Sequence, residues 1–379
     1  MTRCEERSRG HRVRTRRAAA VLAAAVLSLT GCSDDPSDGP DTAAPATSSS
    51  GVATPAGSAE LLAAVTDEVI VPGYREMVDA SAALADGVRS ACAAGGAAGL
   101  GPDALETTRT QYREARAAWR STLAFRVGPA MKHRLMPAVD FPVEPDKIEE
   151  LLASEEPITV ELVSSQGSDR RGLRAVEAVL FAGDGSTMST TDPARRCAYT
   201  AAAAQLVREA GDRVLAEWSD YRAELVGTPA DSLADLVNET IFTLEGVVDG
   251  PLAVALGVTA GEPDPAAANV DAADPGPDRR ALADAVADLD GVLEVYTALI
   301  APLARLQSAD AAERVESDLR SAHGLLVDAP DPLATAAATA NDELVAAHAA
   351  LDAARISLET EIASLLGITL TFSDSDGDS

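Results

Sequence analysis

The sequence predicts an all-α fold arranged as two tandem helical bundles. Apolar residues recur at intervals of three and four through most of the chain, which is typical of helices with one buried face. Signals for strands are nearly absent. Aromatic residues make up 3% of the 379 residues, and the β-branched run Val69-Ile70-Val71 lies within a helical period. The length suits two domains of about 150 residues better than a single core.

The N-terminus has the pattern of an export signal. Residues 3–17 carry seven Arg, and residues 18–29 are almost wholly apolar, too few to form a stable membrane span. The segment Leu29-Thr30-Gly31-Cys32 resembles a lipobox, the site at which bacterial lipoproteins receive a diacylglyceryl group. We therefore expect residues 1–31 to be a cleaved signal peptide and Cys32 to anchor the protein to the outer face of the bacterial cell membrane. The alternative is an ordinary secreted protein in which Cys32 is incidental.

The segment after the predicted anchor reads as a disordered tether. Residues 32–57 are rich in Ser, Asp, Pro, Thr, Gly and Ala and offer almost nothing to bury. The whole chain has a formal charge of −29, and removal of residues 1–31, with seven Arg and two Glu, would bring it to −34. Such an acidic chain repels nucleic acid, so we expect no nucleic-acid partner. It attracts cations, but charge alone does not separate specific metal binding from plain solubility.

The first bundle is predicted over residues 58–226. A helix begins near Ser58, and Pro102 is well placed to begin another, whose apolar stripe has Arg113, Arg116 and Arg120 beside it. The Pro-rich residues 137–158 predict a long connection with one short helix. The short helix is predicted over 146–153, and a further helix over 169–181. A loop over 182–191 then leads to a long helix over 193–225.

The second bundle is predicted over residues 227–368. Gly227-Thr228-Pro229 is a turn signal, and a new apolar period begins at Leu233. Residues 257–279 read as a long loop, and residues 369–379 as a disordered acidic tail. Further helices are predicted over 233–248, 279–305, 309–327 and 331–366.

Two cysteines remain outside the export segment, Cys92 and Cys197. An even pair in an oxidising compartment predicts a disulfide. Binding of a metal by these two thiolates is the weaker alternative, because no His or further Cys stands near either one in the sequence.

The segment from Arg171 to Phe181, Arg-Gly-Leu-Arg-Ala-Val-Glu-Ala-Val-Leu-Phe, resembles the central segment of the imelysin-like family. Its setting is similar too, with Trp119 and Gly128-Pro129 upstream and Arg195-Arg196-Cys197 downstream. The resemblance extends over residues 58–367. It implies a fold of two helical bundles, an extracytoplasmic location and an association with iron-regulated uptake, in a family first catalogued as a peptidase.

The family signature Gly-x-His-x-x-Glu, proposed to bind a metal, is incomplete in this chain. Gly172 and Glu177 match it, but Arg174 stands in place of the His. An imidazole binds iron, copper or zinc well, whereas a guanidinium is always charged and cannot act as a ligand. The resemblance therefore supports the fold and the location better than it supports metal chemistry.

The helical spacing leaves two arrangements open for Glu177. Its side chain faces the core, because Leu173 and Leu180 define the buried face of the helix, and a buried carboxylate needs a partner. Arg174, three residues earlier, could form an ion pair with it. Alternatively, Arg174 could swing outward while Glu177 joins carboxylates of other helices around a divalent metal or iron.

Two further residues are candidate ligands. Glu239, Glu245 and Asp249 surround an apolar stripe, and most of these carboxylates should be solvated. Glu245 is the candidate ligand among them, because it lies near the inner face of the helix. His133 lies among cations in a loop and is a surface residue unless the family's cleft is nearby. His348 lies on an apolar stripe, and Trp119 and Trp218 are predicted core residues.

No catalytic pattern appears in the sequence. The arrangements His-Glu-x-x-His and Gly-x-Ser-x-Gly are absent, so a peptidase is the less favoured hypothesis. The leading hypothesis is a membrane-tethered binding protein, linked to iron or other metal uptake and to the membrane components of that process. The alternative is a non-catalytic structural or protein-interaction lipoprotein that has lost the metal site.

Overall fold

The computed structural model describes residues 54–182, 192–259 and 262–371, and these form almost entirely helices. The prediction of an all-α fold is confirmed. The predicted signal peptide 1–31, the lipidation site Cys32, most of the tether and most of the acidic tail lie outside the described residues. So does the loop over 183–191.

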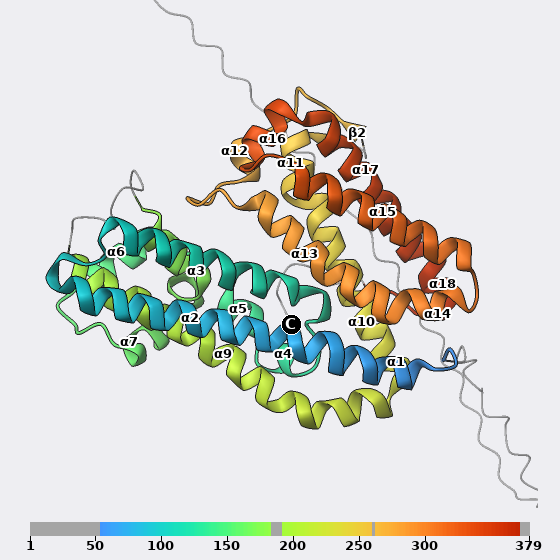
Figure 1. Cartoon of the computed structure of the whole chain (residues 1–379), viewed down its shortest axis with the longest axis horizontal. Helices are drawn as coiled ribbons and strands as arrows, with labels where there is room; N and C mark the ends of the chain where they lie inside the picture. The colour runs from blue at the N-terminus through green and yellow to red at the C-terminus, as the bar shows by residue number, and fades with distance from the viewer. Residues whose placement is uncertain (1–53, 183–191, 260–261, 372–379) are drawn as a thin grey trace, which may run out of the picture. The chain divides into compact units, whose positions relative to one another are not determined.

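The first half of the chain is built around three long helices, which Figure 1 shows running side by side in blue, teal and green. Shorter helices fill the connections between them. The helices are α1 Ser58–Val65, α2 Val71–Gly95, α3 Pro102–Ser121, α4 Pro129–Lys132, α5 Leu135–Val139, α6 Pro145–Ala153, α7 Val160–Ser164, α8 Leu173–Leu180 and α9 Pro193–Gly227. A π-helical turn over Thr66–Ile70 joins α1 to α2, and 3₁₀ turns lie over Gly96–Ala98, Leu123–Phe125 and Ser168–Arg170.

The second half forms another group of packed helices, drawn from yellow to red in Figure 1. It contains one short antiparallel pair of strands. The elements are α10 Pro229–Val247, α11 Ala253–Leu256, β1 Val258–Thr259, β2 Glu262–Pro263, α12 Val270–Ala273, α13 Ala281–Val295, α14 Ala301–Arg305, α15 Ala309–Asp328, α16 Leu333–Thr339, α17 Asn341–Ser357 and α18 Ala363–Leu366. Five-residue π-helical turns lie over Val248–Leu252, Tyr296–Ile300 and Leu358–Ile362.

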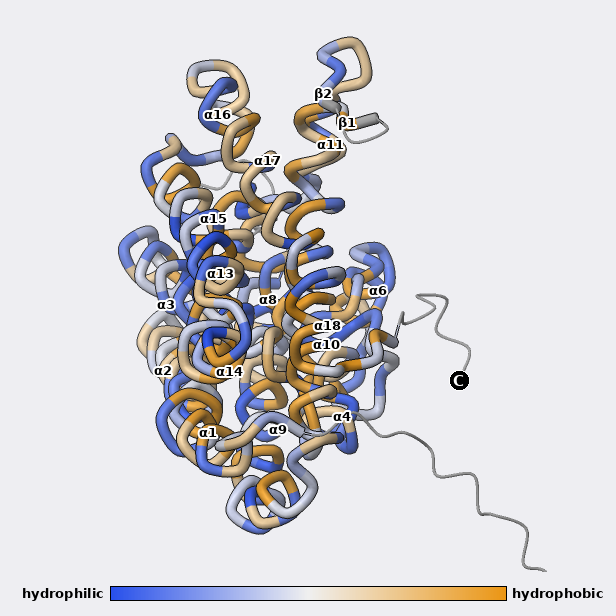
Figure 2. Tube along the Cα trace, turned by 90° about the vertical axis from the view of Figure 1, so that its right-hand side faces the viewer, coloured by the Kyte–Doolittle hydropathy of each residue, from blue (hydrophilic) through white to orange (hydrophobic). Residues whose placement is uncertain are grey.

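The helices are amphipathic, as the sequence periodicity predicts. Figure 2 shows hydrophobic and hydrophilic residues alternating along most of them. The predicted core residues Trp119 and Trp218 are fully buried, and Trp218 stacks on Tyr74 with ring centroids 5.8 Å apart. Burial of such large apolar surfaces is the main force that holds the bundles together.

Several predicted helix boundaries differ from the structure. The single helix expected over 331–366 is two main helices, because the chain leaves helical geometry at Ala340 between α16 and α17. The connection expected over 137–158 holds parts of α5 as well as α6, and the loop expected over 257–279 holds the strand pair and α12. Short elements of this kind carry too few residues to show a helical period.

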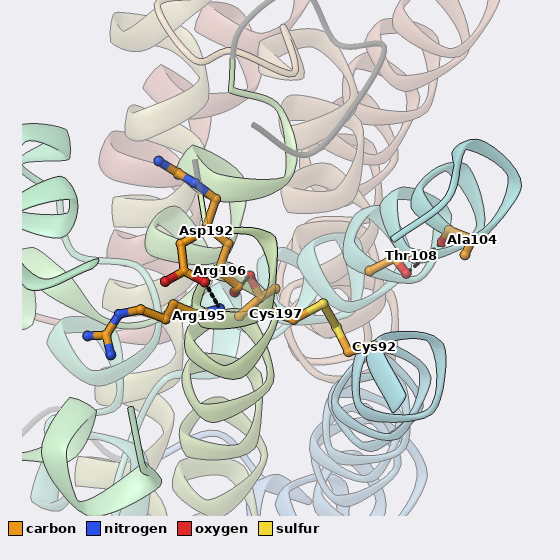
Figure 3. Close-up of a disulfide and its surroundings, with 8 residues drawn as sticks. Cys92, Ala104, Thr108, Asp192, Arg195, Arg196 and Cys197 are labelled. Atoms are coloured by element: carbon orange, nitrogen blue, oxygen red, sulfur yellow. Dashed lines mark hydrogen bonds between the residues drawn. A yellow bond between two sulfur atoms is a disulfide. The ribbon is translucent and has the colours of Figure 1, made fainter. Parts of the chain in front are cut away.

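A disulfide joins Cys92 at the end of α2 to Cys197 near the start of α9, which confirms the predicted pairing (Figure 3). The two Cα atoms lie 5.7 Å apart, and the bond closes a loop of sequence separation 105. Beside it, Asp192 accepts a hydrogen bond from the backbone N–H of Arg195 and so caps α9. The disulfide therefore holds the C-terminal end of α2 next to the N-terminal end of α9.

The two halves meet where α13 runs next to α3 (Figure 1). Gly291 of α13 approaches the end of α3 so closely that an added Cβ would lie 2.0 Å from the carbonyl oxygen of Ser121. The predicted domain boundary at residues 226/227 coincides with the end of α9 and remains a prediction. Among the described residues, no helix is long and apolar enough to cross a membrane.

Candidate functional site

A cavity of about 410 Å³ lies where α3, α8, α10 and α13 converge with the loop after α12. Part of its wall is apolar, from Leu123, Met136, Phe242, Val247 and Pro251. The rest is densely charged. Its arginines are Arg116, Arg120, Arg126, Arg174 and Arg280. Its carboxylates are those of Glu177, Glu239, Glu245, Asp274, Asp284 and Asp288.

Gly172 sets the position of α8 at this cavity. Its φ is +87°, a left-handed conformation that favours glycine, and an added Cβ would lie 2.5 Å from the carbonyl oxygen of Val139. This close approach brings the first turn of α8 against the end of α5. Arg174 consequently lies beside Asp140, the residue that follows α5.

Asp140 is the most highly connected carboxylate of the site. It accepts hydrogen bonds from Arg174 Nε at 2.9 Å, Arg116 Nη1 at 3.2 Å and Trp119 Nε1 at 3.2 Å. Burial alone would raise its pKa, but Arg116, Arg174 and Arg120 outweigh burial and hold the pKa at about 2. Asp140 is therefore ionised at neutral pH.

Glu177 lies in α8 one turn after Arg174 and is buried. Arg174 Nη1 lies 3.6 Å from Glu177 Oε2, and the backbone N–H of Asp278 donates to Glu177 Oε1 over 3.4 Å. Of the two arrangements open for Arg174, the structure contains the inward one. Its nearer partner is Asp140 rather than Glu177.

The arginines of α3 form a row of ion pairs with the second half of the chain. Arg113 pairs with Asp278 at 2.6 Å, Arg116 with Asp284 at 2.6 Å, and Arg120 with Asp288. Arg116 and Asp284 are joined by two parallel hydrogen bonds, the geometry that suits a guanidinium and a carboxylate best. Burial raises the pKa of Asp288 to about 7, although Arg120 opposes the shift.

The candidates on α10 lie on the other wall of the cavity. The Glu239 side chain, expected to be solvated, is instead only 16% exposed and pairs with Arg126 at 2.8 Å. Glu245 lines the cavity half-buried, and burial together with the nearby Glu359 raises its pKa. Glu245 and Glu177 thus line one cavity, as two of the predicted ligands.

His133 does not line this cavity. It caps the C-terminus of α4, and its Nε2 lies 2.8 Å from Glu217 of α9. His348 is buried in α17, as its apolar stripe predicts. In the described part of the chain, no three or more His, Cys, Asp or Glu side chains are grouped so that they could hold a metal ion.

Sequence reasoning missed Asp140, Asp284 and Asp288. Asp140 stands in the Pro-rich connection, where nothing in the local pattern marks a buried carboxylate. The other two have a signal, because Asp284 and Asp288 are four residues apart on one helix face, as are Arg116 and Arg120. Matching acidic and basic stripes predict ion pairs only once the two helices are known to be neighbours.

Comparisons with known proteins identify the fold. A crystal structure of an imelysin-like protein from Psychrobacter arcticum is similar over 85% of this chain and 100% of its own, with a TM-score of 0.69 and 21% identity. A candidate iron-regulated protein A precursor from Parabacteroides distasonis is similar over 84% and 96%, with a TM-score of 0.65 and 15% identity. Identities this low show the fold alone. No curated protein sequence matches the chain.

The sequence itself also matches a family model. The model for imelysin, described as peptidase M75, matches residues 70–359, which is well over half of the chain. The two groups of helices and this match agree with one another. The chain therefore belongs to the imelysin family.

Proposed function

We propose that this protein is a non-catalytic binding lipoprotein, held at the outer face of the bacterial cell membrane through Cys32, that serves iron or other metal acquisition. The observation that carries the proposal is the charged cavity between the two groups of helices. A cavity of this size, with an apolar wall and convergent polar groups, is typical of a ligand site. Membership of the imelysin family and the likeness to a candidate iron-regulated protein support the link to metal acquisition.

The motif position itself does not fit a bare metal ion. Asp140 accepts bonds from Arg116, Arg174 and Trp119, and the Arg174 guanidinium also approaches Glu177. A guanidinium cannot donate electrons to a metal, and its charge would repel one. Arg174 therefore supplies, within the chain, the positive charge that a metal would bring to Glu177.

This arrangement also favours a second candidate function. If the cavity binds nothing, the paired Arg174 and Glu177 stabilise the fold, and the protein is a structural or protein-interaction lipoprotein. The two candidates share the predicted anchor. Membrane components of an iron-uptake system would be partners of the first candidate, whereas the second would act through another protein partner. They differ in whether the cavity has a ligand.

Titration calorimetry on the purified full-length protein separates them. Fe(II), Fe(III), Zn(II) and Cu(II) are titrated into the wild-type protein, Glu177→Gln, Glu245→Gln and Arg174→His. Saturable binding to the wild type, weakened at least tenfold in Glu245→Gln, supports a metal-acquisition role. Binding that appears only in Arg174→His shows that Arg174 blocks the motif and overturns that role for the wild type.

The proposed anchor has its own test. Cys32→Ala should move the protein from the membrane fraction to the soluble extracytoplasmic fraction, because one lipid-modified residue carries the attachment. A variant of the other N-terminal cysteine, Cys4→Ala, is the matched control and should stay with the membrane. Membrane association that persists in Cys32→Ala overturns the lipoprotein proposal.

A further inference from the structure

The charges around the cavity do not balance. Six carboxylates and five guanidiniums line it. Four of these arginines also pair with carboxylates behind the lining: Arg116, Arg120 and Arg174 with Asp140, and Arg280 with Asp331 and Asp278. With Arg113, which pairs with Asp278, the network holds nine carboxylates against six guanidiniums. The cavity's own carboxylates are therefore incompletely neutralised.

Two of these carboxylates are also incompletely hydrogen-bonded. Asp288 binds Arg120 through Oδ2, and its Oδ1 has no hydrogen-bond partner among the described residues. Asp274 accepts from the backbone N–H of Ala281 through Oδ1, and its Oδ2 is likewise without a partner there. Both residues are at least 97% buried, and a buried, unpaired carboxylate oxygen costs free energy. A donor that enters the cavity would remove this cost.

The titration behaviour of the wall agrees with this geometry. Burial raises the pKa of Asp288, Asp274, Glu239 and Glu245, and the opposing arginines only partly offset it. By contrast, Asp140 behind the lining has its pKa lowered. The arginines thus fully offset the burial of Asp140 but only partly offset the burial of these four lining carboxylates.

The chemistry of the wall also limits the class of ligand. Inorganic cations need several oxygen ligands around one point, and no such group exists in the described residues. An anion would be repelled, because the network holds three more carboxylates than guanidiniums. An organic cation needs only one or two carboxylates for its head, and its carbon body can lie on the apolar wall at Leu123 and Phe242.

We propose that the cavity binds a small organic cation, whose ammonium or guanidinium head pairs with Asp288 and Asp274 and whose apolar body lies against Leu123 and Phe242. This inference rests on the proposed function only in that the cavity is a ligand site. The unpaired oxygens are shielded from water in the empty cavity. Binding is therefore expected to displace the partly exposed side chain of Arg120, which pairs with Asp288.

The test compares two ligands of similar shape and opposite charge, phenethylamine and 3-phenylpropanoate, and adds agmatine as an aliphatic guanidinium. Phenethylamine, agmatine and the anion 3-phenylpropanoate are titrated into the full-length protein at pH 8 and about 0.15 M salt, where surface attraction is largely screened. We expect saturable one-to-one binding of at least one of the two cations. We expect no binding of the anion.

Variants locate the site. Asp288→Asn and Asp274→Asn keep the shape of the side chain and remove its charge, so each should weaken binding about tenfold or more. Asp290→Asn is the matched control, because Asp290 lies two residues beyond Asp288 on α13, pairs with His323 and does not line the cavity. Unfolding curves of each variant verify the fold, and displacement of bound phenethylamine by agmatine shows a shared site.

Three outcomes overturn the inference: equal binding of the anion, absence of binding of both cations, or cation binding that Asp288→Asn and Asp274→Asn leave unchanged. Suppose that a metal binds, that Glu245→Gln weakens this binding and that neither amine binds. The proposed function would then stand, and only the organic cation would be excluded as the ligand. An amine that binds while every metal fails would support the ligand class and argue against the link to metals.

Discussion

Arg174 donates its Nε–H to Asp140 across 2.9 Å, although the two residues are 34 positions apart in the chain. Arg174 is therefore part of an ion-pair network centred on Asp140. The network includes Arg116 and Trp119 as further donors. The Arg174 side chain is thus used for charge pairing within the chain.

Removal of Asp140 should strongly destabilise the protein. In Asp140→Ala the almost fully buried Arg116 loses one partner, and Arg174 loses its nearest one. Loss of one partner from a buried ion pair costs about 3 to 5 kcal/mol of unfolding free energy. Urea unfolding at pH 7 measures it. Glu361→Ala, which breaks the exposed pair with Arg314, should cost less than about 1 kcal/mol, and equal effects of the two variants would contradict the central role of Asp140.

Asp288 should make stability depend on pH between about 4 and 7. Its pKa is raised from the ordinary 3.8 to about 7, so the folded state holds a proton that the unfolded state has released, and stability falls as pH rises through this window. Asp288→Asn cannot titrate. Its unfolding free energy relative to wild type should therefore rise from pH 4 to pH 8, by on the order of 3 kcal/mol. Urea unfolding at both pH values checks this, and a difference that stays constant with pH would refute the assignment.

Gly172→Ala should destabilise the protein and disturb the site. The left-handed φ and the carbonyl oxygen of Val139, 2.5 Å from an added Cβ, leave no room for a side chain. We expect a loss of roughly 2 kcal/mol or more in unfolding free energy. Gly324→Ala, where an added Cβ meets nothing within 4 Å, is the control and should be neutral or slightly stabilising. A Gly172→Ala protein as stable as wild type would show that α8 can shift freely.

The disulfide should contribute substantially to stability. Cys92→Ser combined with Cys197→Ser opens a loop of sequence separation 105, and loss of such a cross-link costs about 4 kcal/mol in the chain-entropy model. Thermal unfolding of the double variant and of wild type, both without reductant, measures the difference. Wild type treated with dithiothreitol should approach the double variant, and an unchanged midpoint in both cases would show that the cross-link is dispensable.

The sequence predicts the helices better than it predicts the site. Apolar periodicity marks the long helices, since each needs a continuous buried stripe, and it places Trp119 and Trp218 in the core. The pairing of Arg116 with Asp284 spans 168 positions, and no local pattern encodes which acidic stripe meets which basic one. Glu239 stands beside an apolar stripe, a position that predicts a solvated carboxylate, but Arg126, 113 positions away, pairs with it and makes its burial tolerable.

The row of arginines on α3 has a consequence for how the two halves of the chain depend on each other. Each of the three has one carboxylate partner after residue 270, namely Asp278, Asp284 or Asp288. A gene fragment that encodes residues 58–226 alone would leave Arg113 with only Glu106, and Arg116 and Arg120 with only Asp140 to share. A chimera in which one half of the chain is replaced should therefore be stable only if the new half carries charges that match those of the retained half.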